Sequence, residues 1–282
     1  MTRRTIAREV TAEGVALHAG RNIRMTLTPA PPGTGIVFRR SDLGGVEIPA
    51  RYDRVSETRL GTVIGEGSAR VGVIEHLMAA ISGAEIDDLI VTLDGPEPPI
   101  LDGDALSFLD IISAAGVRES NDVRRAVRML RRVEVYGGKA SAALAPADTL
   151  TFDFEITFPS AAIGMQRMDW AFSPDGFRSE IAPARTFGFM HELDGLNKAG
   201  LARGASLDNT LAIDGDRVIN ASLMRFPDEF VRHKILDALG DLALVGAPII
   251  GRFEGRKSGH ALNNALLRSL FSDSGNFEMV TS

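Results

Sequence analysis

The sequence predicts an α+β protein with two duplicated domains, each a small β-sheet with two helices, packed as a β-α-α-β sandwich. Its 282 residues exceed the usual length of one domain, which favours two. The order of its motifs also repeats: E-H-L-M-A-A-I-S-G from residue 75 is matched by H-K-I-L-D-A-L-G from residue 233, and an apolar strand follows each. His76 and His233 are offset by almost the same number of residues as Asp104 and His260. Two agreeing offsets indicate a duplication.

The charged run from Glu119 to Arg132 is the expected boundary between the domains. We therefore predict an N-terminal domain over residues 1–121 and a C-terminal domain over residues 122–282. We interpret the arginines of this run as a solvated linker and strand edge. If each domain has one helical layer, the two layers can bury one another.

Composition excludes several classes of protein. Hydrophobic residues make up 44% of the chain, yet no apolar run is long enough to span a bilayer. The chain has no cysteine, so disulfides are excluded, and a cytoplasmic location is expected, also because the start M-T-R-R-T-I lacks a secretory signal. The net charge of −6 argues against a nucleic-acid partner. We expect a monomer.

In the first half, alternating apolar residues and turn residues predict strands and two helices. The G-E-G-S turn is flanked by two apolar segments, which predicts a hairpin. A helix ending before Gly83 contains I-E-H-L-M-A-A-I. The expected elements are strands within 3–28, 35–39, 47–55, 59–64, 69–73 and 89–93, and helices over 72–82 and 104–115.

In the second half, the clearest element is an amphipathic helix over residues 226–241. Phe230, Val231, Ile235, Leu236 and Leu239 recur at helical spacing after an acidic first turn. His233, Asp237 and Asp241 follow one another at steps of four residues, so they lie along one side of this helix.

His233 and Asp237 at i, i+4 can share one divalent metal ion. The alternative is an ordinary, partly exposed His–Asp helix pair. The duplication favours the metal site, because packing of the two helical layers would bring His76 beside this helix as a third ligand. Three protein ligands with a fourth position open for water is the usual arrangement of a catalytic zinc site.

Two further residues suggest proton transfer at this site. Glu75 lies about 100° from His76 around its helix, so it can flank a metal as a general base without binding it. Taken alone, Glu75 could equally be a surface carboxylate. His260 begins a helix after K-S-G, and Asp241 is available to hold it protonated, either as a general acid or as an electrophile for a developing oxyanion.

Several motifs resemble those of the UDP-3-O-acyl-N-acetylglucosamine deacetylases of lipid A biosynthesis. They are G-V-A-L-H-A-G, V-I-E-H-L-M-A-A, P-I-L-D-G, A-R-T-F-G-F, D-E-F-V-R-H-K-I-L-D-A-L-G-D and K-S-G-H-A-L-N-N, and together they cover nearly the whole chain. The resemblance implies a zinc-dependent amidohydrolase that removes the N-acetyl group from UDP-3-O-(3-hydroxyacyl)-N-acetylglucosamine, giving acetate and the free amine. The substrate partner is then an acylated UDP-sugar.

The resemblance also implies roles for individual residues. One zinc ion per chain is held by His76, His233 and Asp237. Glu75 is the general base, and His260, oriented by Asp241, is the general acid. Thr186 stabilises the oxyanion and Lys234 contacts the substrate. Residues near the acyl and nucleotide regions are Phe158, Phe187, Phe189 and Lys139, although Phe187 and Phe189 could instead be core residues. An insertion at about 187–216 encloses the acyl chain.

The sequence departs from the family pattern at residues 159–162, 205 and 221–224. Ala205 stands where a glycine is usual, and an added Cβ can narrow a passage. These departures concern residues expected to influence which acyl chain length and which sugar the protein accepts. Two alternatives therefore stay open: a related deacetylase of another N-acetylated sugar nucleotide, and a zinc-stabilised binding protein without turnover. The absence of cysteine and the presence of both Glu75 and His260 argue against the second.

Overall fold

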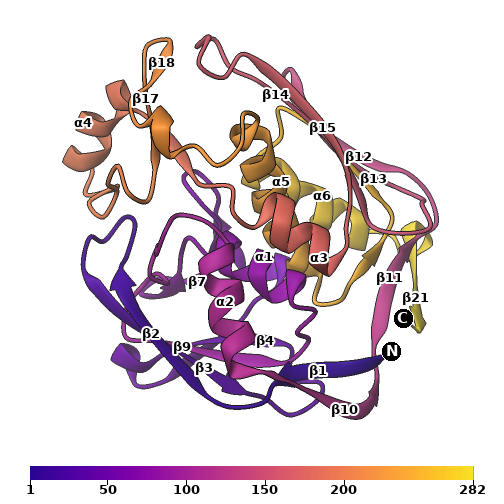
Figure 1. Ribbon diagram of the computed structural model, residues 1–282. Coiled ribbons are helices and arrows are strands. Elements are labelled where there is room, and N and C mark those ends of the chain that lie inside the picture. Colours follow the sequence, from indigo (N-terminus) through magenta and orange to yellow (C-terminus); the bar gives the residue numbers. More distant parts are fainter. Residues whose placement is uncertain (282) are drawn as a thin grey trace.

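The computed structural model describes residues 1–281 and shows an α+β protein with four of its helices between two five-stranded sheets (Figure 1). One sheet belongs to the first half of the chain and the other to the second half. Side chains from both sheets and from the helices between them form one continuous buried core. The predicted fold class is confirmed, whereas the exact domain boundary stays a prediction.

The first sheet alternates buried and exposed residues, as a half-covered sheet requires. In its second strand, Ile23, Met25 and Leu27 are fully buried. All neighbours pair antiparallel except β4 and β9, which are parallel. Its strands, in spatial order, are β2 (Val10–Val15), β3 (Asn22–Pro29), β9 (Leu89–Leu93), β4 (Ile36–Arg40) and β5 (Val46–Pro49).

The second sheet repeats this topology. Here too the last strand in sequence lies in the middle, and its pairing with β14 is the parallel one. Its strands, in spatial order, are β12 (Val133–Gly137), β13 (Ala140–Ala145), β20 (Arg252–Arg256), β14 (Thr151–Thr157) and β15 (Met165–Ala171). Equal strand order and equal directions in both sheets support the duplication that the helix motifs indicated.

Four helices fill the space between the sheets (Figure 1). They are α1 (Glu75–Gly83), α2 (Leu106–Ala115), α5 (Glu229–Leu242) and α6 (His260–Phe271). Helix α1 packs on α5 across the middle of the molecule, α2 packs on α1, and α6 packs on α5. Helix α1 begins later than the predicted residue 72, because Val73 has a φ of 54°, which is incompatible with a right-handed helix.

Among the described residues, four smaller sheets accompany the two main ones. The predicted hairpin at G-E-G-S is present as β7 (Val63–Glu66) and β8 (Ala69–Val71), with β6 (Val55–Glu57) on the other side of β7. The 187–216 insertion contains β16 (Phe187–Phe189), α4 (Met190–Lys198) and β17 (Leu211–Asp214), which pairs with β18 (Arg217–Val218). Short helical segments connect the remaining elements: η1 (Ser41–Leu43), η2 (Tyr52–Arg54), α3 (Pro174–Gly176), η3 (Phe177–Ile181), η4 (Ala221–Leu223), η5 (Ala243–Val245) and η6 (Ser274–Asn276).

The charged run between the halves forms strands. β10 (Val117–Val123) pairs with β1 (Thr2–Ile6), and β11 (Arg125–Met129) pairs with β19 (Ile249–Ile250) and β21 (Phe277–Thr281). The interpretation of Arg124 as a solvated residue was wrong. It is 6% exposed, with Nε 2.8 Å from Asp87 and Nη1 3.0 Å from Glu85.

Within residues 1–281, no helix combines the length and apolar character needed to cross a membrane.

Candidate metal centre and active site

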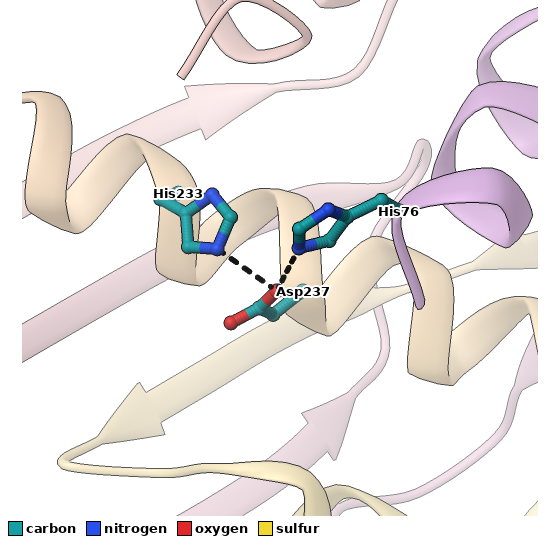
Figure 2. A group of neighbouring side chains, drawn as sticks. All are labelled: His76, His233 and Asp237. Atoms are coloured by element: carbon teal, nitrogen blue, oxygen red, sulfur yellow. Dashed lines mark ion pairs between the residues drawn. The ribbon is translucent and has the colours of Figure 1, made fainter. Parts of the chain in front are cut away.

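His76, His233 and Asp237 converge between α1 and α5 (Figure 2). Each offers one ligand atom, and these atoms all lie within 4.8 Å of one another. Oδ1 of Asp237 is 3.6 Å from Nε2 of His76 and 3.4 Å from Nε2 of His233. All three side chains are buried. The structure thus brings the predicted ligands together.

This cluster needs a cation at its centre. Nδ1 of His233 is 3.0 Å from the carbonyl oxygen of Ala184, which can only accept, so Nδ1 carries the proton. Burial lowers the pKa of His233 to about 3, and the ring therefore stays neutral near pH 7. Its bare Nε2 then faces a carboxylate oxygen, and two buried acceptors in this position repel each other unless a positive ion lies between them.

His76 supports the same interpretation. Its Nδ1 is the one buried side-chain polar atom without a hydrogen-bond partner among the described residues. Its Nε2 faces Asp237, and its ring meets that of His233 edge-on, with ring centroids 4.9 Å apart. The ring is thus aimed into the cluster, although no hydrogen bond at Nδ1 orients it. Nitrogen from two imidazoles with one carboxylate oxygen is a donor set that suits a zinc ion.

The second oxygen of Asp237 is bound by Lys234. Nζ of Lys234 lies 2.6 Å from Oδ2 of Asp237. Burial alone would raise the pKa of Asp237, but the positive charge of Lys234 outweighs it and holds that pKa well below its usual value. Lys234 therefore keeps the carboxylate ionised, which a metal ligand requires. Its predicted contact with a substrate stays a prediction.

Glu75 lies beside the cluster with its carboxylate buried. Burial raises the pKa of Glu75 above its usual value, although His260 and His76 act in the opposite direction. A carboxylate with a raised pKa is a better proton acceptor, which suits a general base. Its Oε1 lies 3.8 Å from Nε2 of His260. The candidate base and the candidate acid therefore face each other beside the three candidate metal ligands.

His260 is held by Asp241, as the sequence predicted. Its Nδ1 donates to Oδ2 of Asp241 over 2.8 Å. Burial would lower the pKa of His260, but the carboxylates of Asp241 and Glu75 outweigh it and raise the pKa to about 9. His260 is therefore protonated near pH 7, and Nε2 carries the proton that a general acid must supply.

Thr186 directly precedes Phe187, the predicted aromatic residue that meets the ring of His233. The backbone N–H of Thr186 donates to Gly103 over 2.8 Å. Phe187 meets the ring of His233 with centroids 6.1 Å apart, and it also meets Phe158 at 5.7 Å. Phe189 lies 5.8 Å from Phe158. These three rings are half-buried and form an aromatic cluster next to the candidate metal site.

Among the described residues, no contact places Lys139 in the site. It is exposed in the turn between β12 and β13. Three further groups at the site were not predicted: Thr62, Asn263 and the Ala184 carbonyl. Asn263 could have been found, because it lies three residues after His260 on the same face of α6. Thr62 gave no local signal.

Three convergent ligands with a buried carboxylate and a protonated histidine beside them have the composition of a metal-dependent hydrolase site. The family model described as UDP-3-O-acyl N-acetylglycosamine deacetylase (LpxC) matches residues 3–272. The UDP-3-O-acyl-N-acetylglucosamine deacetylase of Phenylobacterium zucineum is 47% identical, over 96% of this chain and 93% of the relative. The proteins of the same name from Myxococcus xanthus and Anaeromyxobacter sp. are 46% and 45% identical, each over 98% of this chain and over 88% and 91% of their own lengths.

The chain therefore belongs to the UDP-3-O-acyl N-acetylglycosamine deacetylase family. It is a hydrolytic N-deacetylase of a metal-dependent family.

Proposed function

We propose that the protein removes the N-acetyl group from UDP-3-O-(3-hydroxyacyl)-N-acetylglucosamine in an early, committed step of lipid A biosynthesis. The observation that carries the proposal is the joint placement of Glu75 and His260, 3.8 Å apart, beside the three candidate ligands. A structural metal site needs neither a buried base nor a protonated acid. Their presence therefore favours turnover over a zinc-stabilised binding protein.

His76, His233 and Asp237 would hold one zinc ion per chain, through Nε2 of each histidine and Oδ1 of the aspartate. When bound, the metal supplies a Lewis acid that polarises a carbonyl group and makes water more acidic. Lys234 binds Oδ2 of Asp237, so the carboxylate stays ionised and Oδ1 is left for the metal. The chain's own residues then supply the proton transfers.

Hydrolysis of an acetamide needs one proton removed from water and one delivered to nitrogen. Glu75 takes the proton as the water oxygen bonds to the acetyl carbon. When the carbon–nitrogen bond breaks, Nε2 of His260 gives its proton to the departing sugar nitrogen. The products are acetate and the free 2-amino sugar nucleotide. Asp241 stabilises the cationic form of His260 before this transfer.

Other residues fit the handling of the substrate. The hydroxyl of Thr186 would donate to the developing oxyanion, and Lys234 would contact the substrate. The aromatic cluster of Phe158, Phe187 and Phe189 offers an apolar surface for the acyl chain beside the insertion. Lys139 would meet the nucleotide from its exposed turn. A cytoplasmic location suits a sugar-nucleotide substrate and a chain without cysteine.

The decisive experiment combines substrate choice with variants of the two proton-transfer residues. Mass spectrometry should show loss of one acetyl group from 3-O-acyl UDP-N-acetylglucosamines of several chain lengths, and little from unacylated UDP-N-acetylglucosamine. Equal cleavage of the unacylated compound would favour a deacetylase of another N-acetylated sugar nucleotide. Glu75→Ala and His260→Ala should keep the metal and lower kcat by about 10² or more. Near-normal rates in both would exclude the assigned roles.

A further inference from the structure

Thr62 lies between the candidate base and the partner of the candidate acid. It is 2% exposed and sits just before β7. Its backbone N–H donates to Oε2 of Glu75 over 3.0 Å. Its hydroxyl lies 2.5 Å from Oδ1 of Asp241, and the hydroxyl must be the donor because an ionised carboxylate only accepts. One buried residue thus binds both carboxylates.

The bond from the Thr62 hydroxyl completes the support of Asp241. Oδ2 of Asp241 accepts from Nδ1 of His260 and from Nδ2 of Asn263, each over 2.8 Å. Oδ1 accepts from Thr62. Donors on both oxygens prevent the carboxylate from rotating about its χ2 bond, and the His260 ring is oriented with it.

The same residue fixes the direction of Glu75. Because the N–H of Thr62 binds Oε2, the other oxygen, Oε1, is the one directed at Nε2 of His260. The neighbouring Gly61 makes this approach possible. It has a φ of +134°, and a Cβ there would lie 2.8 Å from Oε1 of Glu75.

We propose that Thr62 is a positioning residue for the deacetylation, holding Glu75 and the Asp241–His260 pair at a fixed separation on the two sides of the scissile bond. The inference rests on the roles proposed above for Glu75 and His260. The N–H and the hydroxyl of Thr62 bind the carboxylates of Glu75 and Asp241, and Thr62 acts through these two groups. Because proton transfer needs donor and acceptor within hydrogen-bond reach of the substrate, loss of this support should slow the chemical step more than it weakens binding.

The test is removal of the hydroxyl with the backbone N–H retained. Thr62→Val should lower kcat about tenfold to hundredfold, the range expected for a hydrogen bond to a charged group, with KM within about threefold of the original. Metal content should stay the same. Thr62→Ser restores a hydroxyl at the same place and should recover kcat to within about threefold. If Thr62→Val does not fold, Thr62→Ala removes the same hydroxyl with less crowding and takes its place.

Two controls separate positioning from a simple loss of stability. Thr5 is also buried, at 7% exposure, and its hydroxyl accepts a hydrogen bond from the backbone N–H of Ala30 over 3.1 Å. Neither residue has a role in the proposed reaction. Thr5→Val should change the melting temperature about as much as Thr62→Val and leave kcat unchanged. In an Asp241→Asn background, Thr62→Val should cost less than about twofold in kcat, because the group through which it acts is already altered.

Three outcomes would overturn the inference. They are an unchanged kcat in Thr62→Val, a loss that Thr62→Ser does not restore, and a loss of equal size in the Asp241→Asn background. Parallel Glu75→Ala and His260→Ala assays keep the two proposals apart. If both lose turnover while Thr62→Val does not, the inference about Thr62 fails and the proposed function stands. If both keep turnover, the proposed function itself fails.

Discussion

The backbone of Gly240 in α5 lies against the carbonyl oxygen of Glu75 in α1, where a Cβ at residue 240 would be 2.0 Å from that oxygen. This contact sets the separation of the two helices at the level of the candidate metal site. Glu75 precedes His76 in the chain, and Gly240 follows Asp237 by nearly one helical turn. The close approach therefore allows a ligand on α1 to meet two ligands on α5.

We predict that Gly240→Ala separates the helices and loosens the metal site. The added methyl meets backbone, which cannot swing away, so the free energy of unfolding should fall by about 1–3 kcal/mol or more. Metal affinity should fall with it, since His76 moves relative to Asp237. Calorimetry and metal titration measure both effects. The matched control is Gly195→Ala in α4, where a Cβ meets nothing within 4 Å and helix propensity makes alanine neutral or stabilising. Equal behaviour of the two variants would contradict the prediction.

A second prediction concerns the metal itself. The purified protein should contain about one zinc ion per chain, and a chelator should remove the metal and the activity together. Asp237→Ala should lower the metal content, because it removes the one charged ligand of the cluster. Elemental analysis measures the metal. His191→Ala, which changes an exposed histidine in α4, should keep the full content. Full zinc in every single-ligand variant would show that the metal binds elsewhere.

The helices and the convergence of their candidate site residues could be predicted because their signals are local. Apolar spacing marks α5, and the repeated motif around His76 and His233 reveals the duplication. Helix α4 was not predicted, since it is short and none of its residues is buried in the core. The order of strands within each sheet could not be predicted either, because pairing joins residues far apart in the chain.

The other differences between the sequence-based predictions and the structure arise from polar contacts between distant segments of the chain. Arg124 looked solvated within its charged run, but its partners Glu85 and Asp87 come from the loop after α1. Thr62 bonds Asp241 across 179 residues of sequence, in a segment that reads only as part of a hairpin. The importance of a polar residue such as Thr62 can therefore be recognised only after the fold has placed it beside its hydrogen-bond partner.

The basic limb of the pH–rate profile should depend on Asp241. The pKa of His260 is raised to about 9, so the acid stays protonated at neutral pH and is lost as the pH rises through that value. Asp241→Asn removes the carboxylate charge, and the basic limb of kcat/KM should move to lower pH. Rates from pH 5.5 to about 10 measure this. Asp208→Asn, an exposed carboxylate in the insertion, should leave the limb in place. An unshifted limb in Asp241→Asn would mean that another group sets it.

Asp153 should make stability depend on pH in the acid range. It is 4% exposed and bound by Arg167, Arg252 and Arg256. Burial opposes ionisation, but hydrogen bonds from Arg256 and Arg167 hold its pKa at about 2. A lowered folded-state pKa gives stability that is present above about pH 4 and lost as the pH falls towards 2. Asp153→Asn should lower the free energy of unfolding by about 1–2 kcal/mol at pH 7, allowing for the exposed arginines. Urea unfolding should show this difference shrinking between pH 5 and pH 3; a constant difference would assign the effect to packing.

The last prediction concerns Ala205 in the insertion. Its segment is held in place from the N-terminal half: the N–H of Ala202 donates to Nδ1 of His18 over 3.2 Å, and a Cβ on Gly204 would lie 2.2 Å from the Ala16 oxygen. A backbone pinned in this way cannot retreat from a substrate.

If the methyl of Ala205 faces the acyl chain, it presses on that chain at one point along its length. Overpacking by one methyl costs about 1–3 kcal/mol, or about five- to 150-fold in discrimination. Ala205→Gly should therefore raise kcat/KM for longer acyl chains more than for shorter ones. Ala199→Gly, at the exposed C-terminal cap of α4, removes a methyl from the same insertion and should leave the ratio unchanged. An unchanged ratio in Ala205→Gly as well would mean that residue 205 faces away and that the acyl preference is set by other residues, among which the Phe158, Phe187 and Phe189 cluster is the next to test.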